Sequence, residues 1–487
     1  MARNESEAFQ VLVRGKTTGS EPLSEISVTI EPVERDSNSK PSWMPEIKTF
    51  QVLDVLYDKP AEDPTFKIPP TNTGWIPDVC LPSKSAKAQN HRPGEIVFLF
   101  DVKTPPLQDK EQKGPVSFDY RLKFSEAGKP QTVASLLLSV QVFPIEIPAR
   151  LPFRTGFHWN WEIDKYLGRE LTETERLAYL DFCLEYRFTP GVLFDKGPNF
   201  SEAEIKIIKE KGGTLFQIFH LGGGGKKVLD DKQKEKFAPQ LKSWRDQMGK
   251  LGVLNDCFAL IADEPPPEAI PAIRKNGEWL KTIFPELKLW VASRPGKELL
   301  DLIDVWDMVV AHSTDHYALH SFTEESLRLV RDNPKNAGFW WFFSVEPYQP
   351  HPNCRLDNDL IDSRAIGWMS FYKGVEGFVY FWPTAWGINK ELRDVPFPEK
   401  AEKWKPGLAG AGVLFYPGND SLPIPSLRLI NLRDGMEDWA LFRLAGDDLR
   451  KIAPFETRDP QNLAELRRQA FRAILQNRFK TRSEPVP

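Results

Sequence analysis

CFALIADEPPPEAIPAIRKNGEWLKTI, residues 257–283, contains one strand and one helix joined by a proline-rich turn. The apolar run at its start is typical of a buried strand, and it ends in two adjacent carboxylates, Asp263 and Glu264. Three prolines follow, and the strand must stop there because proline has no N–H to give to a sheet ladder. Pro265 also predicts an extended conformation for Glu264, the residue before it. The isoleucines and the leucine of the next segment recur at helical spacing. The stretch therefore predicts a buried strand that carries two acids at its end and leads into an amphipathic helix.

The same alternation of apolar run and amphipathic segment recurs between residues 149 and 400. Seven further strands are expected, at TGFHWNW, PGVLF, TLFQIFHL, KLWVAS, DMVVAH, GFWWFFSV and GFVYFWPTAW, and helices are expected between them. Eight βα units over this length predict a (β/α)8 TIM barrel. An open doubly wound sheet is the alternative, but the fingerprint GxGxxG is missing, and the glycine-rich loop at 222–227 lacks the Ser or Thr of a phosphate loop.

The first third of the chain has the period of strands. ISVTIEPV and VSFDYRLKF alternate apolar and polar residues, which is typical of sheets with one buried face. VFPIEIPARLPF, residues 142–153, repeats proline at every fourth position and suits an extended connector. We therefore expect a multidomain protein of β plus α/β class. It comprises an antiparallel β-sandwich at 1–148, a (β/α)8 catalytic barrel at 149–400, and a C-terminal extension of strand and helix at 401–487 packed on the barrel.

Composition excludes several classes of partner. The 487 residues carry a net charge of -4 without a basic tract, which argues against nucleic acid. No apolar run is long enough to cross a bilayer, and MARNESEAF does not resemble a signal peptide. We expect a protein that is cytoplasmic, or one that is secreted or periplasmic with its signal removed. Four cysteines without CxxC spacing favour buried thiols, so we expect no metal and no cofactor.

The two acids suggest hydrolysis of a sugar linkage. Active sites of TIM barrels lie at the carboxyl ends of the strands, so Asp263 and Glu264 are expected at the mouth. Paired carboxylates of retaining glycosidases flank the bond about 5–5.5 Å apart. Adjacent residues have α-carbons about 3.8 Å apart and approach from one wall, so they flank a substrate poorly. The arrangement suits a substrate whose 2-acetamido oxygen closes on C1 to form an oxazoline. Like charges so close also predict a raised pKa, and helix capping is the structural alternative for the pair.

Several segments resemble glycoside hydrolase family 123, which comprises exo-acting β-N-acetylgalactosaminidases, and related domains of unknown function. The resemblance covers nearly the whole chain and is carried by ADEP, GFWWFFSVEP, SRAIGWMSFYKGVEGFVYFWPTAW and GVLFYPGNDSLPIPSLRLINLRDGMEDWALFRL. It implies that Asp263 orients the acetamido group and that Glu264 is the acid/base. It further implies retaining exo-hydrolysis of a terminal β-linked N-acetylhexosamine, with N-acetylgalactosamine favoured. The family tends to have Tyr where Phe342 stands.

Further residues are expected to line the substrate pocket. These substrate-binding candidates are His220, His312, Trp340, Trp341, Glu346, Tyr380, Trp382 and Trp386. Tyr380 and Trp382 share a face of the last strand if its alternation holds. His312, His316 and His320 would form a zinc face on a helix, but His312 ends a predicted strand, so we expect it to contact substrate instead.

Two other functions remain open. Glu264 could pair with Glu346, from the strand-seven segment, as acid/base and nucleophile of a retaining β-glycosidase that needs no acetamido group. A catalytically inactive carbohydrate-binding barrel is the second alternative. A glycan or glycoconjugate is the expected partner in each case. The RDGMED segment, residues 433–438, is expected to form a structural ion network near a helix start.

Overall fold

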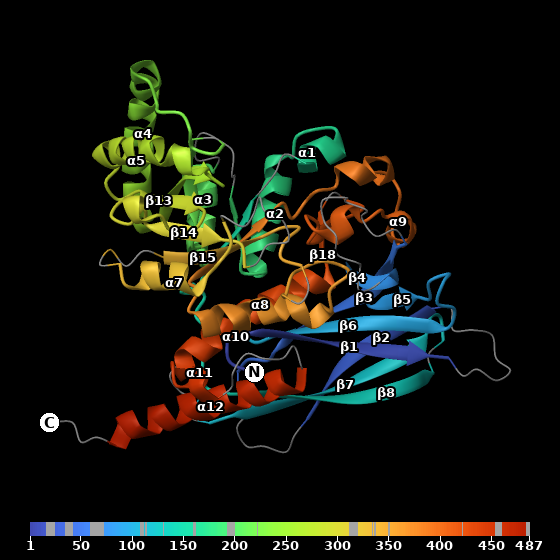
Figure 1. Ribbon diagram of the computed structural model, residues 1–487. Coiled ribbons are helices and arrows are strands. Elements are labelled where there is room, and N and C mark those ends of the chain that lie inside the picture. The colour runs from blue at the N-terminus through green and yellow to red at the C-terminus, as the bar shows by residue number, and fades with distance from the viewer. Residues whose placement is uncertain are drawn as a thin grey trace.

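The computed structural model of the chain describes residues 1–15, 25–34, 42–58, 73–107, 112, 114–129, 131–158, 162–191, 200–221, 223–310, 320–333, 335, 338–348, 351–420, 422–452 and 460–483. Figure 1 shows two architectures, a layered unit of long strands formed by the N-terminal residues and a unit in which strands are surrounded by helices. Helices α8 (Leu360–Lys373) and α10 (Leu427–Ala445) lie between the two.

The N-terminal unit is a sandwich of two antiparallel sheets, as predicted. One sheet has the order β1-β6-β3-β4, comprising β1 (Ser6–Arg14), β3 (Glu46–Tyr57), β4 (Gly74–Pro82) and β6 (Glu95–Lys103). The other has the order β5-β2-β7-β8, comprising β2 (Glu25–Val33), β5 (Ser85–Lys87), β7 (Val116–Glu126) and β8 (Thr132–Val142). Apolar side chains fill the space between the sheets, and Phe98 of β6 lies 5.8 Å from Phe124 of β7 between ring centroids.

The predicted barrel is also confirmed. Eight parallel strands have the order β10-β9-β16-β15-β14-β13-β12-β11. They are β9 (Arg154–His158), β10 (Thr189–Gly191), β11 (Phe216–His220), β12 (Cys257–Asp263), β13 (Lys288–Ala292), β14 (Val305–Met308), β15 (Gly338–Phe343) and β16 (Gly377–Phe381). Strands β10 and β11 end the sheet, and the Thr214 N–H donates to Thr189 Oγ1 at 2.9 Å across this seam. The barrel is therefore nearly closed. We propose that the domain boundaries are those expected from the sequence, at 1–148, 149–400 and 401–487.

Helices surround the barrel strands. They are α1 (Glu162–Leu167), α2 (Glu173–Glu185), α3 (Glu202–Glu210), α4 (Asp231–Leu251), α5 (Ile270–Ile283), α7 (Glu324–Arg331) and α8. Capping boxes begin α2 at Thr172 and α3 at Ser201, because each hydroxyl accepts from the backbone three residues on. None of the described helices combines the length and apolar character of a membrane span.

One predicted helix is absent. KELLDLID, residues 297–304, forms the 3-10 turn η3 (Lys297–Leu299) and then leads directly into β14. Leu299, Leu302 and Ile303 are all buried here. Packing of these three side chains therefore outweighs the helical propensity of the segment.

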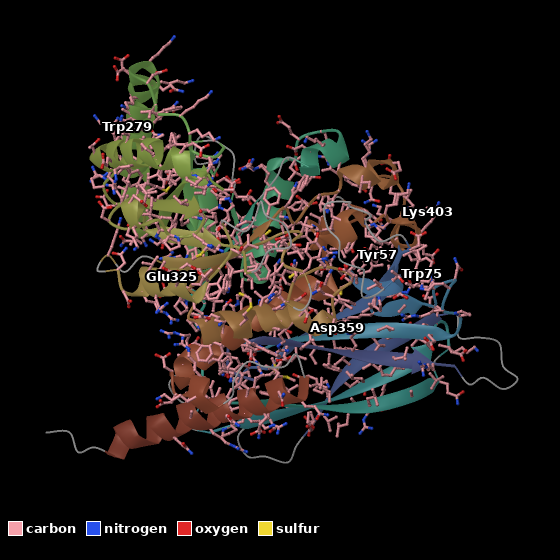
Figure 2. The ribbon with its side chains drawn as sticks, in the orientation of Figure 1. Tyr57, Trp75, Trp279, Glu325, Asp359 and Lys403 are labelled. Atoms are coloured by element: carbon pink, nitrogen blue, oxygen red, sulfur yellow. The ribbon has the colours of Figure 1, made fainter. Side chains whose placement is uncertain are left out.

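The C-terminal extension connects the barrel to the sandwich. Before it, η4 (Gly387–Leu392) belongs to the barrel range, and α9 (Glu399–Lys403) crosses the proposed boundary at residue 400. The extension contains η5 (Gly407–Gly410), β17 (Phe415–Pro417), β18 (Pro423–Pro425), α10, α11 (Leu449–Ile452) and α12 (Pro460–Ser483). Helix α9, which carries Lys403, contacts β3, and Figure 2 labels Tyr57 and Trp75 in this region of the sandwich. The Asn90 side chain donates to Glu402 at 3.2 Å.

Buried ion pairs of α10 bind the sandwich. Arg428 donates to both oxygens of Asp78 on β4 at 2.9 and 2.8 Å. Arg433 donates to both oxygens of Asp101 on β6 at 2.8 and 2.9 Å, and to Asp434 at 3.0 Å. These paired charges connect α10 to both β4 and β6 of the sandwich.

The sequence suggested that RDGMED, residues 433–438, forms an ion network near a helix start. These residues instead lie in the middle of α10. The reason is a close approach of two helices at Gly435. A Cβ placed on Gly367 of α8 would lie 1.9 Å from the Gly435 carbonyl oxygen, so both positions must be glycine. This contact fixes which turn of α10 faces α8 and therefore which charges become buried.

Replacing Arg433 with methionine is expected to lower the free energy of unfolding by about 3–5 kcal/mol, because Asp101 and Asp434 lose their buried cation. Urea unfolding followed by circular dichroism measures the change. The matched control is Arg14→Met, which removes a mostly exposed pair with Glu95 and should cost less than about 1 kcal/mol. Equal effects of the two substitutions would show that the α10 network does not hold the units together.

Candidate active site

The acid pair lies at the carboxyl end of β12. Asp263 is the last residue of this strand, and its N–H donates to the carbonyl of Gly223 at 3.2 Å. The next N–H, of Glu264, donates to the carbonyl of Ala292 at the end of β13 at 3.1 Å. Both main-chain groups are therefore held by neighbouring segments of the barrel rim, one on each side of β12.

The backbone at Glu264 differs from the prediction. Its φ is +45°, whereas the proline that follows suggested an extended conformation, so that expectation was wrong. The Ala292 carbonyl holds the Glu264 N–H while Pro265 turns the chain away from the sheet. A left-handed conformation costs a residue with a side chain about 1–2 kcal/mol. Such strain is typical of functional sites, and Trp382, after β16, has a φ of +71°.

The surroundings of Asp263 shift its pKa. Burial raises the pKa of Asp263 to about 6, and the negative charge of Glu264 contributes to the increase. At neutral pH Asp263 is therefore mainly ionised, although it titrates close to that range. A carboxylate of this kind can accept a hydrogen bond from an amide N–H.

A third acid, Asp307 on β14, was not among the predicted site residues. Strand register aligns Asp263 of β12 with Ala292 of β13 and Ala292 with Asp307. Asp307 is 1% exposed. Burial and the negative charge of Asp263 both raise the pKa of Asp307 well above its ordinary range, whereas the Trp290 indole acts in the opposite direction. The neutral form of its carboxyl group is therefore favoured in this environment. The signal in the sequence was an aspartate inside the apolar run VWDMVV.

Replacing Asp307 with asparagine is expected to change kcat/KM by less than about threefold, because a neutral carboxyl group and an amide have nearly the same shape and charge. Kinetics with an aryl glycoside and thermal unfolding measure the effect. Replacing Asp307 with alanine instead leaves a cavity and should cost about 1–3 kcal/mol of stability. A folded Asp307→Asn enzyme with little activity would mean that Asp307 acts in its ionised form.

The structure describes only some of the polar residues that were predicted near the pocket. His220, the last residue of β11, is buried, and Glu346, which follows β15, is 3% exposed. His312, a predicted substrate contact, and His316 lie outside the described residues. His320 is buried, and its Nδ1 lies 3.1 Å from the Ser293 hydroxyl beyond β13. His220 thus ends the strand next to β12 and stays a candidate contact.

Two neighbouring tryptophans of β15 point to opposite faces. Trp340 packs inside the barrel against Phe258 and Trp290, at 5.1 and 5.4 Å between ring centroids. Trp341 packs outside it, against Phe322 and Phe339 at 5.3 and 4.8 Å. The expectation that Trp341 contacts substrate is therefore wrong, because alternate strand residues face opposite sides. Trp340 belongs to the barrel interior beneath the mouth.

The aromatic residues on and after β16 also lie in different surroundings. Tyr380 is fully buried, and its hydroxyl accepts from the Gly412 N–H at 3.2 Å in the C-terminal extension. Trp386 is fully buried and donates to the Phe415 carbonyl at 2.9 Å. Both residues pack in the core outside the barrel, which corrects their assignment to the pocket. Trp382 is partly buried, and the positive φ at this residue ends the alternation that was expected to place it beside Tyr380.

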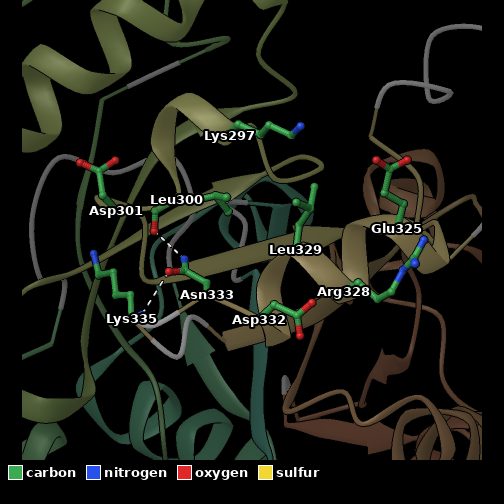
Figure 3. Close-up of a pocket in the computed structure, with 9 residues that line it drawn as sticks. All are labelled: Lys297, Leu300, Asp301, Glu325, Arg328, Leu329, Asp332, Asn333 and Lys335. Atoms are coloured by element: carbon green, nitrogen blue, oxygen red, sulfur yellow. Dashed lines mark hydrogen bonds between the residues drawn. The ribbon is translucent and has the colours of Figure 1, made fainter.

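A metal site and a surface groove are two other kinds of site to compare with the acid pair. No group of three or more His, Cys, Asp or Glu is arranged to hold a metal ion in the part of the chain that the structure describes. A groove of about 990 Å³ lies between η3 and α7 and is lined by side chains of both charges, such as Lys297, Asp301 and Arg328 (Figure 3). None of its lining residues belongs to the acid pair or to the predicted pocket, so we assign it no catalytic role.

Comparisons with known proteins give a family match and a similarity of fold. The glycoside hydrolase 123 catalytic domain matches residues 179–445, just over half of the chain. A solved family 123 glycoside hydrolase from Clostridium perfringens, described in terms of glycolipid glycan hydrolysis, aligns with a TM-score of 0.65 and 13% identity over 98% of this chain and 92% of that one. At this identity the similarity shows the shared fold.

Other solved glycoside hydrolases resemble the chain more weakly. A family 5 enzyme from Bacteroides vulgatus aligns with a TM-score of 0.33 and 13% identity over 48% of this chain and 59% of that one. A family 53 catalytic domain from Ignisphaera aggregans aligns with a TM-score of 0.31 and 12% identity over 59% of this chain and 97% of that one. Neither similarity is close enough to carry an argument. No protein of curated function matches the sequence.

Proposed function

Since the chain belongs to glycoside hydrolase family 123, we propose that it is a retaining exo-hydrolase of terminal β-linked N-acetylhexosamine, with N-acetylgalactosamine favoured. The observation that carries the proposal is the adjacency of Asp263 and Glu264 at the end of one barrel strand. Because both acids approach from one wall, the proposed reaction uses no protein nucleophile on the opposite side of the anomeric carbon. The substrate's own acetamido oxygen fills that role.

The first chemical step breaks the glycosidic bond. Glu264 gives its proton to the leaving oxygen while the acetamido carbonyl oxygen attacks C1 and forms an oxazolinium ion. The ionised Asp263 accepts a hydrogen bond from the acetamido N–H and stabilises the positive charge that develops there. Its position at the barrel rim, with its N–H fixed by Gly223, supports this orienting role.

The second step restores the sugar with its original configuration. Glu264, now ionised, takes a proton from a water molecule, whose oxygen attacks C1 from the side that the leaving group vacated. The C1–oxygen bond of the oxazoline breaks and returns its electron pair to the acetamido group. Two inversions at C1 give net retention. Because the Clostridium perfringens relative is described as hydrolysing glycolipid glycans, these glycans are a candidate substrate class for this chain as well.

The decisive assay compares aryl β-glycosides with and without the 2-acetamido group. We expect turnover of the N-acetyl-β-galactosaminide and no measurable turnover of the plain β-galactoside. Hydrolysis of both at similar rates would favour Glu264 with Glu346 as nucleophile, although the 3% exposure of Glu346 gives a sugar little access to it. Binding without turnover of any glycoside would favour an inactive carbohydrate-binding barrel.

The activity is expected to fall at acid pH with an apparent pKa of about 6, because Asp263 must be ionised to orient the acetamido group. Its folded-state pKa is raised, so the functional carboxylate is present above about pH 6 and is lost as the pH falls through that value. Below it, kcat/KM should drop about tenfold per pH unit. A pH profile of kcat/KM measures this limb, which should disappear in Asp263→Asn; a limb that persists in that variant belongs to another group.

A further inference from the structure

We propose that the chain forms a two-fold symmetric dimer in which β8 of one copy pairs antiparallel with β8 of a second copy about Leu137. This inference concerns the sandwich and does not depend on the proposed function. It joins the two β5-β2-β7-β8 sheets into one continuous sheet.

Strand β8 is an edge strand with an apolar surface. Among the described strands it pairs only with β7, and on its other edge Met1 covers the end of the strand at Gln141 and Phe143 but not residues 135–139. Val133, Leu136 and Leu137 are 50%, 45% and 61% exposed. Edge strands of monomeric proteins are normally protected by charges, proline or short length. TVASLLLSVQV, residues 132–142, has none of these protections, since it contains no charged residue and no proline over its eleven residues.

The sequence of β8 is complementary to itself. It is nearly symmetric about Leu137, with leucine at 136 and 138, serine at 135 and 139, and small apolar residues at 134 and 140. Antiparallel pairing about that residue places Leu137 opposite Leu137, Leu136 opposite Leu138, and Ser135 opposite Ser139 of the second copy. A two-fold interface requires a surface that matches itself in this manner. No like charges meet, because the strand carries none.

The backbone directions of β8 permit this register. The Met1 ammonium group donates to the Gln141 carbonyl at 2.7 Å, and the Phe143 N–H donates to the Met1 carbonyl at 2.9 Å, both on the edge away from β7. Odd-numbered residues from 135 to 141 therefore direct their N–H and C=O groups outward, since the ladder with β7 is regular over this range. Leu137 would then form a hydrogen-bonded pair with its own copy, flanked by two pairs of residues 135 and 139.

Packing adds to these hydrogen bonds. Leu138 already contacts the apolar core between the two sheets. In the dimer, Leu136 of the second copy lies beside it and extends that core across the two-fold axis. The contact involves one strand from each copy and so falls at the small end of stable interfaces. We therefore expect a dissociation constant in the micromolar range, with dimer and monomer both observable.

Sedimentation velocity on the full chain from about 1 to about 100 µM tests the proposal. We expect a monomer–dimer equilibrium that Leu137→Lys abolishes, because two ammonium groups would meet on the axis. The matched control is Leu12→Lys, at a 44%-exposed leucine of β1 in the other sheet, which should leave the dimer intact. A chain that is monomeric throughout, or a dimer that Leu137→Lys does not weaken, would overturn the proposal.

A cysteine at the axis gives a second measurement that does not rely on weakening the fold. Leu137→Cys places two Cα atoms about 5.5 Å apart, within reach of a disulfide. The four native cysteines are buried, so mild oxidation should link the variant through residue 137. We expect a covalent dimer with unchanged glycosidase activity, and Leu12→Cys should remain monomeric on a denaturing gel. Equal cross-linking of both variants would contradict the proposed interface.

Discussion

Replacing Glu264 with glutamine is expected to lower kcat/KM for an aryl N-acetyl-β-galactosaminide by about a thousandfold. The amide can neither protonate the leaving oxygen in the first step nor take a proton from water in the second, and each proton transfer contributes about 10²–10⁴ to the rate. Steady-state kinetics with purified enzyme measures the loss, and circular dichroism shows whether the variant is folded.

Two comparisons make this result specific. A leaving group that is stable as an anion needs little protonation, so Glu264→Gln should lose much less of its first-step rate with a dinitrophenyl glycoside than with a nitrophenyl glycoside. The matched control is Glu268→Gln, since Glu268 follows the same prolines but is 65% exposed and pairs with Lys226. That substitution should leave the rate unchanged within about twofold. A large loss in both variants would point to disruption of the turn.

Replacing Asp263 with asparagine is expected to lower kcat by about a hundredfold to a thousandfold on the same substrate. The amide cannot supply the negative charge that stabilises the oxazolinium ion, and removal of one such stabilising group costs about 10²–10³ in rate. An Asp263→Asn enzyme with full activity would show that the carboxylate has no part in the reaction.

The same substitution should not weaken the fold. The folded-state pKa of Asp263 is raised to about 6, so the ionised form is less favourable in the folded protein than in the unfolded chain above that pH. A neutral asparagine removes this cost at pH 7, and its melting temperature should equal or exceed that of the unmodified protein. The contrast with Asp307→Asn, which is expected to keep its activity, separates the roles of the two aspartates within one barrel.

The architecture was predictable from the sequence because it depends on period. Alternation in the first third and the repeated pairing of apolar run with amphipathic segment predicted both the sandwich and the barrel, and the prolines after Glu264 marked the end of β12. The turn at 297–299 was missed because packing of three apolar side chains decided it.

The identity of the pocket residues depends on facts that the sequence does not contain. Trp340 and Trp341 are adjacent and chemically identical, and the register of β15 alone decides which of them enters the barrel. Tyr380 and Trp386 are buried by partners more than twenty residues away, in the C-terminal extension. The high pKa of Asp307 arises from burial and from a charge two strands away, which no local pattern reveals.

The central claim is that the substrate supplies the nucleophile, and a series of fluorinated substrates tests it most directly. Replacing the N-acetyl group of an aryl N-acetyl-β-galactosaminide with mono-, di- and trifluoroacetyl groups progressively weakens the carbonyl oxygen as a nucleophile while the leaving group stays the same. We predict that kcat/KM falls steeply with each added fluorine. Rates that stay constant along the series would mean that the acetamido oxygen does not attack C1, and would contradict the proposed mechanism.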